Sequence, residues 1–272
     1  MESCLNQGAK IDQGVDWNAP WLSAVQELGR QISCSADWRV ELNRLARLNP
    51  LLTRGKLPVK FAEQQALPPG ESYEAYISAT GHVPTRDNLH DFFNALVWLT
   101  FPRIKAQLNA LQAQQIAHLG VGKSRGPSRD AATLFDENAA ILAVTDTPEG
   151  RRIVDALRNH QWSQVFVQDR ARFKHRADVF LFGHAIMEKL VRPYKAVTAH
   201  TLVCWVNDEF HALPLIEKVS LLDAQITLEL ETRQLIPSVF SPLPILGVPD
   251  WWPNQDLPFY ADTNVFRPAR QR

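Results

Sequence analysis

Imidazole and carboxylate side chains recur in this sequence at spacings that could gather them in one place. His184 and Glu188 stand four residues apart in a stretch over 179–191 that we expect to be a helix, so both side chains point the same way. Further candidates lie in or beside other expected elements: His90, Asp91, Asp136, Glu137 and His200. Imidazole together with carboxylate is a ligand set that suits zinc, iron or manganese.

These residue types suggest a metal-assisted hydrolase, in which a bound divalent ion activates water and a carboxylate moves the proton. The hypothesis divides the residues into metal ligands (His184, Glu188, His200) and catalytic groups (His90, Asp91, Glu137). The alternative is a non-catalytic binding or scaffold protein with structural histidines. In that case His184 is a core histidine bonded to the backbone, and Glu188 pairs with a neighbouring lysine or arginine.

The pair His90-Asp91 is similar to the HD dyad of metal phosphohydrolases, but the match is poor. Those enzymes use a separate upstream histidine, whereas His82 stands only eight residues earlier and beside Gly81, outside the expected helix. The alternative is an exposed dyad that makes local hydrogen bonds or interacts with the start of its helix.

A glycine-rich basic loop over 120–127 is the second candidate site. Its Gly-Lys-Ser at 122–124 is similar to the end of a phosphate-binding P-loop, but that motif needs a glycine where Ala117 stands and a strand before it. We therefore exclude a nucleoside triphosphatase. A looser anion site formed by Lys123, Arg125 and Arg129 is the remaining hypothesis, and a solvated basic loop is the alternative.

Composition limits the other classes of function. The chain has 272 residues, of which 45% are hydrophobic, and its 29 basic residues equal its 29 acidic residues, which disfavours a nucleic-acid-binding protein. Such a role would have to rely on a local patch, which we assign to Arg103, Lys105, Lys123, Arg125 and Arg129. The three cysteines form no CxxC pair, and no G-x-S-x-G motif marks a serine nucleophile.

Neither a signal-peptide pattern nor an apolar run of about 20 residues is present, so we expect a soluble cytoplasmic protein with no membrane partner. A small molecule or another protein remains the expected kind of partner, and any cofactor would be a divalent metal ion.

Periodicity predicts the elements that must position these residues. We expect a helical hairpin over 17–50, an extended connector over 54–70 and a short helix over 71–80. Farther along, helices are expected from Asp87 or Asn88 to about Phe101, from Pro102 to about His118, from Thr147 to about Asn159, and over 213–235. Residues 136–138 are expected to form the turn before a buried strand at 140–144, and a second strand is expected over 197–206.

The predicted fold is therefore one α+β domain that is mostly helical, with a small sheet built from segments near 140–145 and 197–206. We place a flexible N-terminus at 1–16 and one globular domain at 17–268. That domain would comprise the hairpin at 17–50, a central body at 84–235 and an extended proline- and aromatic-rich strap at 237–268.

Four long motifs give the chain a family resemblance: "PTRDNLHDFFNALVWLTFPRIKAQLNALQ" (84–112), "RGPSRDAATLFDENAAIL" (125–142), "LFGHAIMEKLVRPYKAVTAH" (181–200) and "PLPILGVPDWWPN" (242–254). They resemble a proteobacterial family catalogued as domain of unknown function 3025. The likeness spans roughly residues 30–268, which implies one continuous domain, and it implies no activity.

Overall fold

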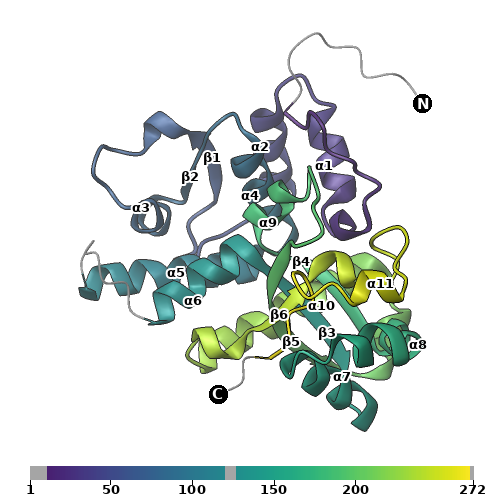
Figure 1. The fold of residues 1–272 in the computed structure, drawn as a ribbon. Coiled ribbons are helices and arrows are strands. Elements are labelled where there is room, and N and C mark those ends of the chain that lie inside the picture. The colour runs from purple at the N-terminus through teal and green to yellow at the C-terminus, as the bar shows by residue number, and fades with distance from the viewer. Residues whose placement is uncertain (1–10, 120–126, 270–272) are drawn as a thin grey trace.

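The computed structural model describes residues 11–119 and 127–269, and it confirms a mixed α+β chain in which helices predominate over two small sheets (Figure 1). One cluster of buried apolar side chains runs through the described residues from Trp17 to Phe266. None of the described helices is both long and apolar enough to cross a bilayer.

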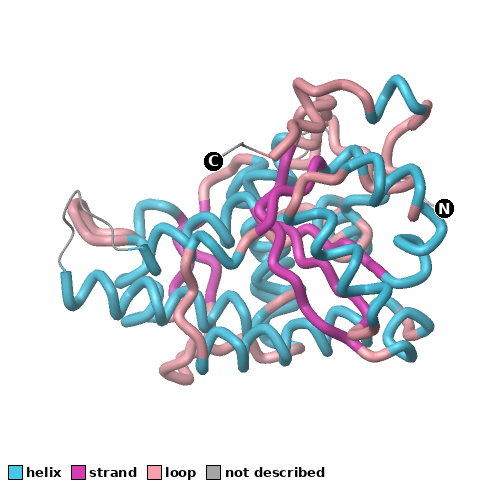
Figure 2. The backbone as a smooth tube through the Cα atoms, turned by 60° about the horizontal axis from the view of Figure 1, so that its bottom comes forward, coloured by secondary structure: helices cyan, strands magenta, loops and turns pink. Residues whose placement is uncertain are grey.

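The larger sheet has the order β4-β3-β5-β6 and lies at the centre of the molecule (Figure 2). Strand β3 (Ala139–Thr145) is buried along its whole length because helices cover it. It pairs in parallel with β5 (Thr198–Val206) and antiparallel with β4 (Ala177–Leu181), while β6 (Ser241–Pro244) adds to the outer edge of β5. The two predicted strands are therefore present and adjacent.

Strand β4 corrects the predicted helix over 179–191. The run Val179–Leu181 belongs to the sheet, and the helix α9 (His184–Lys189) has only six residues and is separated from the strand by two residues. A strand covered on both faces shows no period-2 alternation, so its apolar run cannot be distinguished from a buried helix by pattern alone.

The predicted N-terminal hairpin is formed by α1 (Gln26–Ser33) and α2 (Trp38–Leu48), and the Asp37 side chain caps α2 by accepting hydrogen bonds from its first amides. The connector over 54–70 is not wholly irregular, because β1 (Lys60–Glu63) pairs in parallel with β2 (His82–Thr85). Between them runs α3 (Tyr73–Thr80).

Helices α4 (Leu89–Thr100) and α5 (Pro102–Leu119) follow the prediction closely. Asn88 caps α4, while α5 takes its cap from another helix: Asp223 on α10 (Leu215–Thr232) accepts a hydrogen bond from the Ile104 amide at 2.9 Å. A buried carboxylate therefore supplies the acceptor that the start of α5 lacks locally.

Helix α6 (Pro127–Asn138) runs directly into β3, so the turn predicted at 136–138 is wrong: those residues are the last of the helix. The expected helix after Thr147 is α7 (Pro148–Arg158), capped by the Thr147 side chain. The other helical segments are short: α8 (Arg170–Arg176), α11 (Leu257–Tyr260), 3-10 turns at 20–22, 64–66, 208–212, 237–239 and 245–247, and a π turn at 164–168. The C-terminal strap is thus a mixture of strand β6, short turns and α11.

Candidate metal centre

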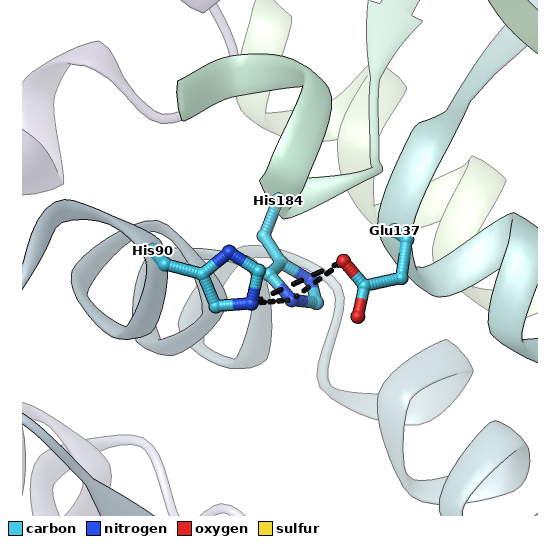
Figure 3. Close-up of side chains that lie close together, drawn as sticks. All are labelled: His90, Glu137 and His184. Carbon is cyan, nitrogen blue, oxygen red and sulfur yellow. Dashed lines mark hydrogen bonds and ion pairs between the residues drawn. The ribbon is translucent and has the colours of Figure 1, made fainter. Parts of the chain in front are cut away.

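Three helices meet where α4, α6 and α9 each contribute one side chain: His90, Glu137 and His184 (Figure 3). The Nε2 atoms of the two imidazoles are 3.1 Å apart. Glu137 Oε2 lies 3.5 Å from His184 Nε2 and 3.9 Å from His90 Nε2. These residues are separated by 47 or more positions in the chain, so only the tertiary fold brings them together.

The three atoms have the spacing of metal ligands. The circle through three points with those separations has a radius of about 2 Å, so one point lies about 2 Å from all three atoms, the length of a Zn–N or Zn–O bond. Two imidazoles and one carboxylate occur together as ligands of catalytic zinc and of non-haem iron.

The other ring nitrogens of both histidines face carboxylates. His90 Nδ1 lies 3.0 Å from Glu188 Oε2, and His184 Nδ1 lies 3.9 Å from Asp136 Oδ2. Metal-bound histidines characteristically donate their second ring N–H to a carboxylate or carbonyl, which fixes the tautomer and leaves the first nitrogen free to bind the ion. The contact with Glu188 leaves His90 Nε2 free to bind an ion, whereas the Asp136 carboxylate is too far from the buried His184 Nδ1 for a hydrogen bond.

Gly183 explains how α9 comes so close to the end of α6. A Cβ atom added at this residue would stand 2.4 Å from the Ala139 amide nitrogen and 2.5 Å from the Glu137 carbonyl oxygen. The amide of Gly183 also donates a hydrogen bond to the Ala139 carbonyl at 2.8 Å. Because glycine allows this backbone contact, the next residue, His184, reaches Glu137.

Beneath the three side chains lies a buried ion pair. Lys105, on α5, donates to Asp136 Oδ1 at 2.5 Å and to Asn94 Oδ1 at 2.8 Å, and its side chain is only 5% exposed. Asn94 in turn donates to the Tyr73 hydroxyl at 3.1 Å. This chain of contacts fixes the Asp136 carboxylate beside His184, at the inner side of the site.

Burial sets the protonation of the inner groups. It lowers the pKa of His184 to about 4, so the imidazole is neutral at physiological pH and its lone pair is available to a metal ion. Burial would raise the pKa of Asp136, but the charge of Lys105 and its hydrogen bond to this carboxylate outweigh burial and hold that pKa below its usual value. Burial and the Asp136 charge both raise the pKa of Glu137.

Four of the residues proposed from the sequence lie together: His90, Glu137, His184 and Glu188. Their roles differ in part from the hypothesis, because Glu188 contacts the far nitrogen of His90, while His90 and Glu137 offer ligand atoms.

Asp91 and His200 are placed differently. Asp91 is turned to Arg86, with which it forms a bidentate ion pair at 2.8 and 3.0 Å. His200 lies on β5 in edge contact with the ring of Phe240, and it is not among the residues whose ligand atoms converge. Neither residue reaches the group of three ligand atoms.

The predicted anion site can be located only in part. Lys123 and Arg125 lie outside the described residues. Arg129 is on α6, where its charge acts on Glu74 of α3. Glu74 is held by Asn109, and burial together with the Asp136 charge raises its pKa to about 7.

The contribution of Lys105 was not predicted as part of the site. The signal for it was the polar stripe Lys105, Asn109 and Gln112 on α5, whose members are 4–5% exposed in the structure. A polar stripe with that spacing normally faces solvent, so its pattern does not predict a position beneath the histidines.

A second polar cluster lies at the sheet. His211 Nε2 is 2.9 Å from the Thr145 hydroxyl and His211 Nδ1 is 3.1 Å from Asp178, which also accepts from Lys218. The order of groups is that of a nucleophile triad, but Thr145 is 1% exposed and cannot meet a substrate. Asp178 and Lys218 also line a cavity of about 310 Å³, and none of His90, Glu137 and His184 lines it.

A family model described as "Protein of unknown function (DUF3025)" matches residues 59–270. The chain belongs to this DUF3025 family. No curated protein and no solved structure matches the chain. The family description carries no activity, so the chemistry of the DUF3025 chain must be argued from its own side chains.

Proposed function

We propose that this DUF3025 protein binds a divalent metal ion through His90 Nε2, His184 Nε2 and Glu137 and uses it to activate water for hydrolysis. The observation that carries the proposal is the spacing of these three atoms, which leaves one point about 2 Å from each of them. Three protein ligands leave coordination positions for water and substrate, as in catalytic rather than structural zinc sites.

Accessibility supports a catalytic site. The inner residues are nearly closed to solvent, since the His184 side chain is 4% exposed, whereas His90 and Glu137 are 30% and 34% exposed. An ion held here would face solvent on the side of His90 and Glu137. Glu188, which is 42% exposed, contacts His90 Nδ1 and so orients that ring with its Nε2 toward the ion.

Elemental analysis is the direct test. Protein is purified without chelator and without a histidine tag, and metal per chain is measured for wild type, His90→Ala, His184→Ala and Glu137→Gln. The matched control is His175→Ala, because His175 is an exposed histidine away from the site. We expect about one ion per chain in wild type and in the control, and its loss in the three site variants.

The outcomes separate the alternatives. A wild type that stays metal-free after incubation with zinc, manganese and ferrous iron would contradict the proposal and favour a non-catalytic binding or scaffold protein with structural histidines. Because the same ligand set holds iron in oxygenases, retention of iron in preference to zinc would replace hydrolysis by oxygen chemistry. His90→Ala serves where His184→Ala fails to fold, since His90 is only partly buried.

A further inference from the structure

A guanidinium is held in a fixed orientation by the residue that follows His90 on α4. Arg86 donates through Nε and one Nη to the two carboxylate oxygens of Asp91, the residue next to His90, and its side chain remains 56% exposed. The hydrogen bond to Asp91 is the main cause of the raised pKa of Arg86, and the charge of Glu188, which contacts His90, also contributes. Within the described part of the chain, its Nη1 makes no hydrogen bond.

The ammonium of Lys189 contacts the residue that follows Glu137. Lys189 follows Glu188 on α9 and donates to Asn138 Oδ1 at 2.8 Å, one residue beyond Glu137. Its charge acts on both Glu137 and His200. The charge of Arg86 therefore interacts with Glu188, and that of Lys189 with Glu137.

The net charge of the site changes sign when a divalent ion binds. Two pairs are internally neutral: Arg86 with Asp91, and Lys105 with Asp136. The remaining groups are the carboxylates of Glu137 and Glu188 and the ammonium of Lys189, which leave one excess negative charge. A divalent ion converts this to one excess positive charge, so the loaded site attracts anions.

We infer that the substrates of this site are anionic phosphoesters, with the Arg86 guanidinium and the Lys189 ammonium receiving phosphoryl oxygens that the metal ion does not bind. The inference rests on the proposed metal-assisted hydrolysis. In the reaction the oxygen of activated water bonds to phosphorus, the P–O ester bond breaks with its electron pair on the leaving oxygen, and the water proton ends on the released alcohol.

A phosphoester suits the geometry better than a carboxylic ester. A phosphoryl group offers several oxygens, so one can bind an ion while others meet a guanidinium edge. Arg86 is held in one orientation by Asp91, which reduces the entropy lost on binding. A neutral carboxylic ester offers no negative charge to either cation.

Two measurements test the inference. Binding of inorganic phosphate to metal-loaded protein is followed by calorimetry at constant ionic strength, with acetate as the carboxylate probe. Hydrolysis of p-nitrophenyl phosphate and bis(p-nitrophenyl) phosphate is then compared with that of p-nitrophenyl acetate. The variants are Arg86→Gln, Arg86→Lys and Lys189→Gln, and the control is Arg151→Gln, which removes an exposed arginine paired with Asp146.

We expect phosphate to bind more tightly than acetate, and Arg86→Gln to weaken phosphate binding about tenfold or more, because a charge-assisted hydrogen bond is lost. Arg86→Lys should recover part of the affinity, Lys189→Gln should lower it to a smaller degree, and Arg151→Gln should leave it unchanged. Unfolding midpoints of all variants show which of them are folded.

Failure of this inference can be told from failure of the proposed function. Metal-loaded protein that binds phosphate no better than acetate, or that binds it equally in Arg86→Gln, would overturn the phosphoester assignment and leave the metal site intact. Hydrolysis of the acetate ester but of neither phosphoester would do the same. Protein that takes up no metal removes the proposed function itself.

Discussion

Replacement of Lys105 by methionine should destabilise the protein strongly, because Lys105 neutralises a carboxylate inside the fold. The two side chains of the Lys105–Asp136 pair are 5% and 16% exposed. Methionine fills similar space but leaves Asp136 without its counter-charge and Asn94 Oδ1 without its donor. Removal of one partner of a buried ion pair costs about 3–5 kcal/mol, and the partial exposure of Asp136 suggests the lower end, about 3 kcal/mol.

The double variant separates the charge effect from packing. The double variant Lys105→Met with Asp136→Asn has no uncompensated charge. Its loss in free energy of unfolding should therefore be about 2 kcal/mol smaller than the summed losses of the two single variants. A matched control is Arg151→Met, which breaks an exposed ion pair with 61% and 48% exposed side chains and should cost less than about 1 kcal/mol.

Urea unfolding followed by tryptophan fluorescence measures these free energies, provided that the m-values of wild type and variants agree. A loss below about 1 kcal/mol in Lys105→Met would refute the reasoning, as would single losses that simply add in the double variant. Either result would mean that water screens the charge of Asp136 and that Lys105 does not fix this carboxylate beside His184.

Three further predictions concern the site and its supports. Gly183→Ala should cost more than about 2 kcal/mol in urea unfolding and weaken metal binding, because the new Cβ would overlap the backbone of Ala139; unchanged zinc affinity by chelator competition would argue against this role. Burial lowers the pKa of His184 to about 4 from 6.5, so stability is lost as pH falls between these values. As pH falls over that interval, the free energy of unfolding of metal-free His184→Gln should rise by about 3 kcal/mol relative to that of metal-free wild type. Burial raises the pKa of Asp223 to about 6 from 3.8, so stability is lost as pH rises between these values. Over that pH interval the free energy of unfolding of Asp223→Asn should rise by about 3 kcal/mol relative to that of wild type. Parallel pH profiles of the two unfolding free energies would contradict this prediction.

Local sequence signals located most of the elements. Asn88 and Thr147 cap α4 and α7 where the prediction placed the starts of those helices, and Pro102 begins α5. These signals succeed because a capping hydrogen bond or a missing amide acts within a few residues of its own position. The boundary between β4 and α9 was missed because burial on both faces erases the periodicity that distinguishes a strand from a helix.

The sequence by itself determined which side chains of this protein are candidates for chemistry: the i, i+4 pair His184 and Glu188, together with His90 and Glu137. Only the tertiary structure decided how they combine, with Glu188 behind His90, Asp91 turned to Arg86 and His200 apart. The physical reason is that spacing along a helix fixes a direction, whereas a ligand set needs distances between helices. Those distances depend on backbone contacts such as that of Gly183 against the end of α6, which no local pattern encodes.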